Sequence, residues 1–371
     1  MSEFEEIHDE LRAVARGLLA KTGHETATDW SALARAGWPG LEAPAEFDGA
    51  GATFAEVAVL LEEIGRAAAL TAFPSVAVLG LGALGMLAPD TLRDKLFRES
   101  VAGGAVPVVA LPGEWGAGAD TGSPVVDPGA VMAGVTFALA GESGDQFLSG
   151  AAEFVCDVTA AGPLLVPARA PDGNVVIAVV EPGAAGLTVT AQPVVDATRV
   201  FGRVVADRVA VAPGAVLRFA GDGAAALRRL YDRAAIATAC DSLGLSVAML
   251  DATVEYVRVR EQFGRPVGSF QAVQHACADM LVQVTVARQL VMAAVRGEVV
   301  RSPDAAVAAS RAKAYATEAA VRVAGKAMQL HGGIGYTWES GIHVYLKRAT
   351  LNRSLFGTPA AHRARLALRF R

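Results

Sequence analysis

A stretch of fifteen residues, REQFGRPVGSFQAVQ at positions 260–274, decides which fold we expect for the C-terminal half of the chain. It lies between two long segments with helical periodicity. Gly264 and Pro266 interrupt that periodicity, because neither residue suits a helix interior. The pattern therefore predicts two long helices joined by a tight loop.

The same loop is rich in groups that suit a bound anion. A tight connection allows the side chains of Arg260, Gln262 and Gln271 to converge, and the arginine fork suits a phosphate or pyrophosphate. Phe263 can lie against an aromatic ring system. The alternative interpretation is a plain helix end, with Arg260 at the C-terminus and Phe263 in the core.

Helical periodicity extends through the rest of the C-terminal half. Residues 243–257 and 270–291 each carry an apolar stripe at three- and four-residue spacing. A third helix is expected from Pro303-Asp304 to Leu330, and a final helical segment from about residue 342. Helices joined by short loops are typical of a four-helix bundle, which we expect over residues 221–371.

The first two thirds of the chain divide into a helical part and a strand-rich part. Residues 1–105 show helical stripes, and Thr53 is expected to cap a helix that runs to Arg66. Short β-branched runs separated by Gly, Pro and Asp fill residues 106–220 and predict a sheet or barrel. These runs are 106–111, 131–139, 157–166, 175–180, 187–190 and 203–211.

The predicted fold class is therefore α+β with three domains: helical (1–105), β (106–220) and a helical bundle (221–371). No strand is followed by G-x-G-x-x-G and a helix, so nothing indicates a Rossmann domain.

Composition excludes several classes of protein. The 371 residues carry a net charge of −5 and no basic stripe, which argues against nucleic-acid binding. No unbroken apolar run approaches the roughly 20 residues of a membrane span, and the acidic N-terminus does not resemble a signal peptide. Three scattered cysteines support neither a disulfide framework nor a metal site. We expect a soluble cytoplasmic protein.

Two further stretches are rich in glycine. Gln329 is followed by His331-Gly332-Gly333, whose glycines expose backbone N–H groups and permit close approach of a ligand. We expect His331 to be structural rather than catalytic. Residues 113–120 (GEWGAGAD) follow a predicted strand and offer a weaker signal of the same kind.

Taken together, these stretches resemble the acyl-CoA dehydrogenase family of flavoproteins over essentially the whole chain. Arg260 to Pro266 with Gln271 is similar to the family's R-x-x-F-G…Q element, and Gln329 with Gly332-Gly333 to its Q-x-x-G-G element. In the family both elements reach the FAD of a neighbouring subunit, which implies FAD as cofactor and an oligomer. The cofactor-binding residues implied on this side are Arg260, Gln262, Phe263, Gln271, Gln329, Gly332 and Gly333.

The middle-domain flavin motif departs from the family pattern T-E-P-G-x-G-S-D. Gly113 and Ala119 replace its two hydroxyl residues, so two side-chain hydrogen bonds are missing. The later W-I-T element is matched only by Phe154-Val155-Cys156. The flavin-binding residues that the resemblance implies in this half are Glu114, Gly116, Ala119, Phe154 and Cys156.

The catalytic base is the larger departure. The family's usual Glu before Gly-Thr corresponds to Phe356, and an alternative Glu position on the long helix corresponds to Ala234. The segments 333–339 and 343–349 resemble an actinobacterial subgroup that acts on steroid side-chain CoA thioesters, often as heterotetramers of two different chains. Some members of that subgroup carry the base at the position of Asp241. Asp241 is therefore a candidate base, a relic in a silent subunit, or a surface residue or partner of a nearby Arg.

The resemblance implies α,β-desaturation of an acyl-CoA thioester. A base removes the α-proton, and burial would have to raise the pKa of a carboxylate such as Asp241. The competing hypothesis is a non-catalytic subunit that completes the FAD site of a sister chain. A dehydrogenase that acts on acyl-carrier proteins is a third alternative. An electron-transfer flavoprotein is the family's usual electron acceptor.

Overall fold

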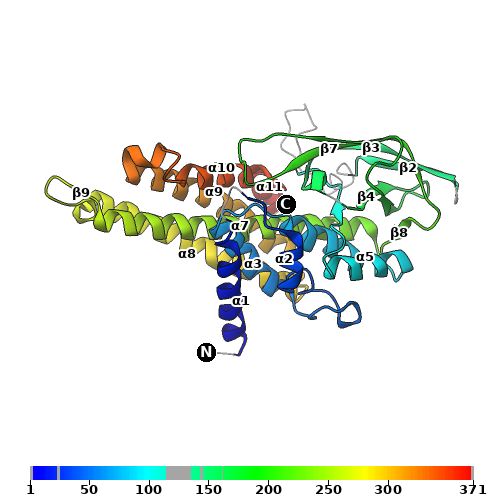
Figure 1. The fold of residues 1–371 in the computed structure, drawn as a ribbon, viewed down its shortest axis with the longest axis horizontal. Helices are drawn as coiled ribbons and strands as arrows, with labels where there is room; N and C mark the ends of the chain where they lie inside the picture. The colour runs from blue at the N-terminus through cyan, green and yellow to red at the C-terminus, as the bar shows by residue number, and fades with distance from the viewer. Residues whose placement is uncertain (1–2, 23–25, 114–134, 143–144, 161, 369–371) are drawn as a thin grey trace.

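The computed structural model describes residues 3–22, 26–113, 135–142, 145–160 and 162–368, with helices before and after one sheet (Figure 1). This order confirms the predicted fold class. The first part of the chain contains α1 (Glu3–Leu19), α2 (Trp30–Arg35), η1 (Ala45–Phe47), α3 (Phe54–Arg66), η2 (Pro74–Leu81), α4 (Gly82–Leu84) and α5 (Thr91–Val101).

Helix α3 begins where the sequence predicts. The Thr53 side chain accepts a hydrogen bond from the Ala55 N–H, and Glu56 accepts one from the Thr53 N–H at 2.8 Å. This capping box satisfies two N–H groups that a helix start leaves without partners.

One mixed sheet forms the middle of the chain. Its strands are β1 (Val108–Val109), β2 (Phe137–Glu142), β3 (Asp145–Cys156), β4 (Leu164–Arg169), β5 (Val175–Val180), β6 (Leu187–Ala191), β7 (Phe201–Val211) and β8 (Val216–Arg218). The spatial order is β6-β7-β3-β2-β4-β5-β8, and β1 pairs with β4 in parallel.

The strand predictions need correction at several positions, and the short strand β8 was not predicted at all. Strand β3 was not predicted, because its sequence DQFLSGAAEFVC is rich in Gly, Ala, Ser and acidic residues that disfavour strands. Pairing with β2 and β7 on its two sides overrides that preference. The strand predicted over 157–166 begins only at Leu164, because Val158–Ala160 form a short 3-10 turn.

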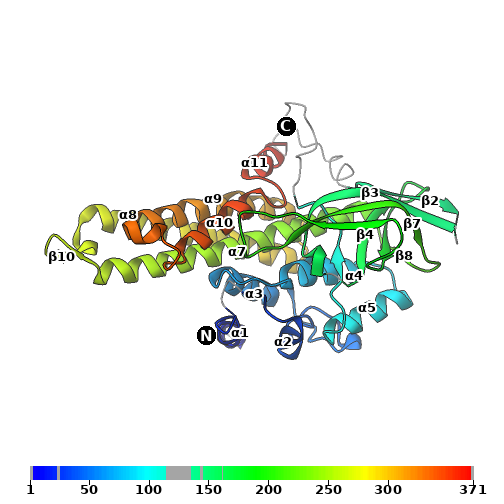
Figure 2. The same cartoon turned by 45° about the horizontal axis from the view of Figure 1, so that its top comes forward.

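The last part of the chain is the expected bundle. It consists of α7 (Gly223–Val259), α8 (Gln271–Val299), α9 (Ala305–His331), α10 (Ile342–Ser354) and α11 (Pro359–Ala367). Figures 1 and 2 show α7 along the length of the molecule, with α8 and α9 beside it. One end of α7 reaches the sheet, and the other carries the small hairpin β9 (Glu261–Gln262) and β10 (Arg265–Pro266).

Two glycines bring α3 against α7. A Cβ at Gly65 would overlap the carbonyl oxygen of Asp241, and one at Gly244 would overlap that of Glu62. Only residues without a side chain permit this approach. The first helical part of the chain is thereby fixed against the centre of the bundle.

The two large hydrophobic cores do not follow the predicted domain boundaries. One joins the sheet to η2, α5 and the start of α7, and the other joins α1 and α3 to α7, α8 and α9. The division at 105/106 and 220/221 stays a prediction. Helices α7 and α8 are long and apolar enough to cross a membrane by length and composition, but α7 is the mostly buried core helix of the bundle.

Candidate functional site

The first candidate residues lie at the free end of α7. Arg260 ends the helix, with its N–H donating to the Tyr256 carbonyl at 2.9 Å, and its own carbonyl accepts from the Val267 N–H at 2.8 Å. This second bond closes the loop. The turn residue Phe263 has a φ of 53° and is 92% exposed, which excludes the alternative that placed it in the core.

The three polar side chains of the loop all face solvent. Arg260, Gln262 and Gln271 are exposed, and the Gln262 amide donates to the Glu261 carbonyl at 2.8 Å. Within this fully described loop, no hydrogen bond joins these three side chains to one another. All three side chains are therefore accessible to another molecule.

The second glycine-rich stretch lies at the end of α9. Gln329 is exposed and accepts a hydrogen bond from Lys326 at 2.8 Å. Gly332 has a φ of 62°, which favours glycine, and open space surrounds both Gly332 and Gly333. They begin the turn η5 (Gly332–Tyr336), where Tyr336 is also largely exposed.

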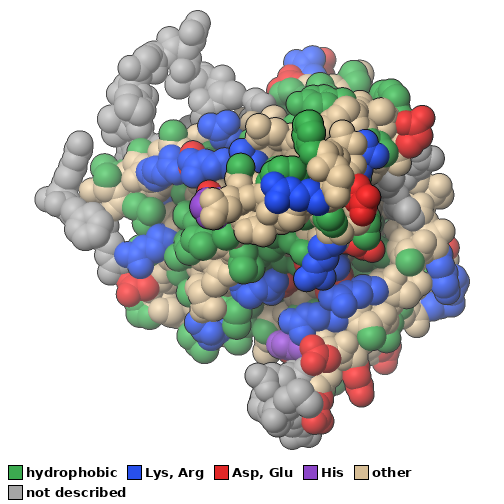
Figure 3. Space-filling model, turned by 90° about the vertical axis from the view of Figure 1, so that its left-hand side faces the viewer, with side chains coloured by type: hydrophobic (Ala, Val, Ile, Leu, Met, Phe, Trp, Pro, Cys, Tyr) green, Lys and Arg blue, Asp and Glu red, His purple; other side chains and the backbone are tan. Residues whose placement is uncertain are grey.

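Figure 3 views the molecule towards this end and shows Lys and Arg side chains interspersed with hydrophobic ones. Exposed Arg260 and Arg265 supply positive charge, and exposed Phe263 and Tyr336 supply rings. Guanidinium forks, aromatic rings and open glycine backbone are the groups that would hold a pyrophosphate and the rings attached to it.

The middle-domain half of the predicted flavin site is described only in part. Glu114, Gly116 and Ala119 lie outside the described residues. Phe154 donates its N–H to Gln192 at 2.6 Å, and its carbonyl accepts the Gly113 N–H at 3.1 Å. Gly113 is required there, because a Cβ would press on the Phe154 carbonyl.

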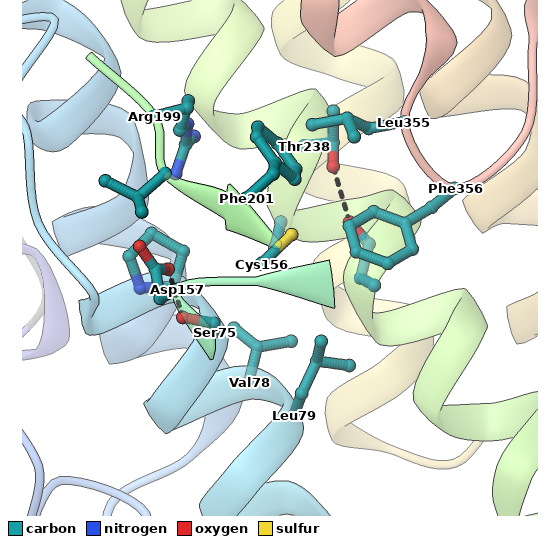
Figure 4. Close-up of a pocket in the computed structure, with 14 residues that line it drawn as sticks. Ser75, Val78, Leu79, Cys156, Asp157, Arg199, Phe201, Thr238, Leu355 and Phe356 are labelled. Atoms are coloured by element: carbon teal, nitrogen blue, oxygen red, sulfur yellow. Dashed lines mark hydrogen bonds between the residues drawn. The ribbon is translucent and has the colours of Figure 1, made fainter. Parts of the chain in front are cut away.

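A small cavity of about 40 Å³ lies between η2, the end of β3, the beginning of β7 and the first half of α7. Figure 4 shows Cys156, Phe201, Thr238 and Phe356 around it. Ala234 also lines the cavity, so both family positions for a glutamate base are here occupied by apolar residues. Such a volume holds water molecules but not a three-ring flavin.

The main chain at Phe356 closes this site further. The Phe356 N–H donates to the Gly113 carbonyl at 2.7 Å, so this donor is already engaged within the chain. The Phe356 ring packs edge-on against Tyr231, with centroids 6.5 Å apart. The described residues of this half therefore do not fit a flavin and a thioester together.

Two buried nitrogen groups fix the loop that carries Phe356. Lys313 donates to the Gly357 carbonyl at 2.7 Å, and His362 donates to the Phe356 carbonyl at 2.9 Å. Burial lowers the pKa of Lys313 to about 7 and that of His362 to about 4. Burial thus disfavours the charged form of both groups.

Asp241 has a different environment from the one that a base requires. It is 1% exposed and bonds Arg348 at 2.5 and 3.1 Å, Arg199 at 3.0 Å and Asn352 at 2.6 Å. Burial alone would raise the pKa of Asp241, but the charges of Arg348 and Arg199, with bonds from Arg348 and Asn352, lower it. The rise in pKa that a base role requires is therefore absent, and Asp241 does not line the cavity. Of the three sequence-based alternatives, the partner of a nearby Arg agrees with this geometry.

The structure also reveals polar groups that the sequence analysis did not select. Asp157 lines the cavity and accepts a hydrogen bond from the Ser75 hydroxyl (Figure 4). Burial raises the pKa of Asp157 to about 6. The sequence offers one signal for Asp157: it directly follows Cys156, the last residue of the stretch that matches the family's W-I-T element. Burial and the charge of Asp157 also raise the pKa of Cys156 to about 12, so this thiol stays protonated.

The order of helices, mixed sheet and bundle is that of the acyl-CoA dehydrogenase fold. Family models match the acyl-CoA dehydrogenase N-terminal domain over residues 2–104 and the C-terminal domain over residues 221–370. Because these matches cover more than half of the chain, it belongs to the acyl-CoA dehydrogenase family. Members of this family are oxidoreductases that act on acyl-CoA.

The relatives include steroid-type members. Acyl-CoA dehydrogenase IpdE2 of Mycolicibacterium smegmatis is 29% identical, with 97% of this chain and 93% of the relative covered. A variant of the Tcur3481-Tcur3483 steroid ACAD is 30% identical, with a TM-score of 0.82 over 98% of this chain and 97% of that one. The ChsE4-ChsE5 complex of Mycobacterium tuberculosis is 25% identical, with a TM-score of 0.84 over 100% and 98%. These similarities confirm the resemblance to the steroid-type subgroup.

Among the described residues, no group of three or more His, Cys, Asp or Glu could hold a metal ion.

Proposed function

We propose that this chain is a subunit of an FAD-dependent acyl-CoA dehydrogenase and that it completes a flavin site on a sister chain. The observation that carries the proposal is a contrast between two regions of α7. At its C-terminal end, Arg260, Gln329 and the Gly332-Gly333 backbone are open to solvent. In its first half, the chain's own cavity is lined by Phe356, whose N–H is bonded to Gly113.

Each open group has a chemical role in this proposal. Arg260 would bind the FAD pyrophosphate through its fork, and Phe263 would pack near the adenine. Gln262, Gln271 and Gln329 would supply amide hydrogen bonds. Bound FAD would accept the hydride from the β-carbon of the thioester.

The sister chain would supply the catalytic base and the donors to the thioester carbonyl. Both described candidates for these roles in this chain are already bonded: Asp241 to two arginines and the Phe356 N–H to Gly113. The alternative is an active homo-oligomer in which this chain has its own base. The closed cavity favours the sister-chain proposal.

Exposed apolar surface on α8 supports assembly with another subunit. Leu281 and Val282 are 55% and 60% exposed, and Met292 is 45% exposed. Apolar side chains at this density on one helix are typical of a subunit interface.

Three further parts of the proposal have other sources. The similarity to steroid-type relatives supports a steroid side-chain CoA ester as the substrate. The sequence resemblance supports an electron-transfer flavoprotein as the electron acceptor, and the sequence composition supports a cytoplasmic location.

The Arg260→Met variant tests the proposed function. The chain is tagged in its own cells, and the FAD that co-purifies with the assembled enzyme is measured by visible absorbance. We expect Arg260→Met to reduce bound FAD at least about tenfold, because a charge-assisted pair to phosphate is lost. Arg258→Met, two residues earlier and also exposed, is the matched control. Equal FAD content in both variants would contradict the proposal.

A further inference from the structure

A pair of aromatic side chains joins the Arg260 loop, which follows α7, to the Gly332-Gly333 turn, which follows α9. The rings of Tyr256 and His331 are stacked, with centroids 4.3 Å apart and planes inclined by 21°. The Tyr256 hydroxyl donates to the His331 carbonyl at 3.3 Å. A ring contact and a hydrogen bond thus link the last turn of α7 to the last residue of α9.

The positions of these two residues show which two backbone segments the contact connects. Tyr256 lies four residues before Arg260, and its carbonyl accepts the Arg260 N–H. His331 lies between Gln329 and Gly332. The pair therefore connects the backbone that sets the direction of Arg260 to the backbone that sets the position of the glycine turn.

His331 is fixed on a second side. It is 9% exposed, and its Nδ1 donates to the Ala327 carbonyl at 2.8 Å, one turn earlier in α9. The stack and this bond fix the ring within the bundle, which agrees with the structural role expected from the sequence. Gly332 and Gly333 have open space around them and no side chains, so they gain no packing of their own.

We propose that Tyr256 and His331 are positioning residues that hold the Arg260 loop and the Gly332-Gly333 turn in register, so that both meet one flavin of the sister subunit. Neither residue touches that flavin. The positioning role rests on the proposed function, since it needs a cofactor that spans both elements. Two binding elements that are already held in a fixed relative position lose less conformational freedom on binding than two elements that move independently.

The first test needs no cofactor. Hydrogen–deuterium exchange of the amides in residues 332–336 is measured in the purified chain. Loss of the stack in Tyr256→Leu should raise exchange there about tenfold, whereas Tyr256→Phe, which keeps the ring, should change it little. Tyr231→Leu removes another tyrosine from the far end of α7 and should leave these amides unchanged. Unchanged exchange in Tyr256→Leu would overturn the proposal.

The second test separates this role from the proposed function. FAD affinity is compared in the assembled enzyme for Arg260→Met, Tyr256→Leu and the double variant. If Tyr256 acts by placing Arg260, each single change weakens FAD and the double variant is less affected than the sum. Weakening by Arg260→Met alone would overturn the positioning role and leave the proposed function standing. No weakening by either change would overturn both.

Discussion

Arg348 lies 2.5 Å from the carboxylate of Asp241, and the two side chains are 0% and 1% exposed. The same guanidinium donates to the Thr198 hydroxyl at 3.0 Å and to the Ala69 carbonyl at 2.8 Å. One buried side chain therefore bonds to the bundle, to the segment before β7 and to the segment after α3. Asp241, a candidate base only by sequence resemblance, here joins the bundle to the segment before β7 and pairs with Arg348, which reaches the segment after α3.

The first prediction concerns this ion pair. Asp241→Ala leaves two arginines without a carboxylate in the interior, so we expect a loss of about 4 kcal/mol in the free energy of unfolding, measured with urea. Removing both charges, in Asp241→Leu with Arg348→Met, should cost less than the sum of the single changes. A base role would instead predict that Asp241→Asn keeps stability near wild type while abolishing turnover.

A second prediction concerns Asp157 and pH. Its folded pKa is about 6, above the unfolded value of 3.8, so the folded state keeps a proton that the unfolded state releases. The resulting stability is fully present below pH 3.8 and is lost as pH rises through about 6.

Asp157→Asn cannot ionise and should remove this dependence. We expect the variant to match wild type near pH 4 and to exceed it by about 2 kcal/mol at pH 7. Urea unfolding at a series of pH values measures the difference. If the free energy of unfolding changes with pH equally in the wild type and in Asp157→Asn, the pKa of Asp157 does not differ between the folded and unfolded states.

A third prediction concerns the contact of α3 with α7. Gly244→Ala places a methyl group on the carbonyl of Glu62, and we expect a loss of about 3 kcal/mol from the forced separation of the helices. Gly325→Ala in α9 is the matched control, because open space surrounds Gly325. That change should stabilise the chain by about 0.8 kcal/mol through helix propensity, so the two alanines should have opposite signs in thermal unfolding. Destabilisation of equal size would mean that close approach is not the cause.

Local sequence predicts much of this fold because local physics determines it. The Thr53 cap, the break at Gly264 and Pro266, and the long amphipathic stripes each depend on residues within a few positions. Strand β3 could not be predicted in this way, since pairing with two distant strands stabilises a segment of low strand propensity.

The candidate site likewise has one part that the sequence predicts and one part that it does not. The glycine turn at Gly332-Gly333 and the end of α7 at Arg260 are visible in sequence, because both follow from the backbone preferences of Gly and Pro. The partners of Asp241 are not, since Arg348 is 107 residues away in the chain. The pKa of Asp241 depends on such partners, so the sequence could not decide between a base and the partner of an arginine.

The last prediction concerns restoration of the base. Phe356→Glu returns a carboxylate to the position that the family uses, yet we expect no reduction of added FAD by acyl-CoA in the isolated chain. The Phe356 N–H would still be bonded to Gly113, and a cavity of about 40 Å³ would still exclude the ring system. Loss of the ring that packs on Tyr231 and burial of a charge should also cost about 3 kcal/mol of stability. Flavin bleaching on addition of acyl-CoA, absent from a Phe356→Gln control, would show that the closed site opens, and the chain would then need only a base to be an independent enzyme.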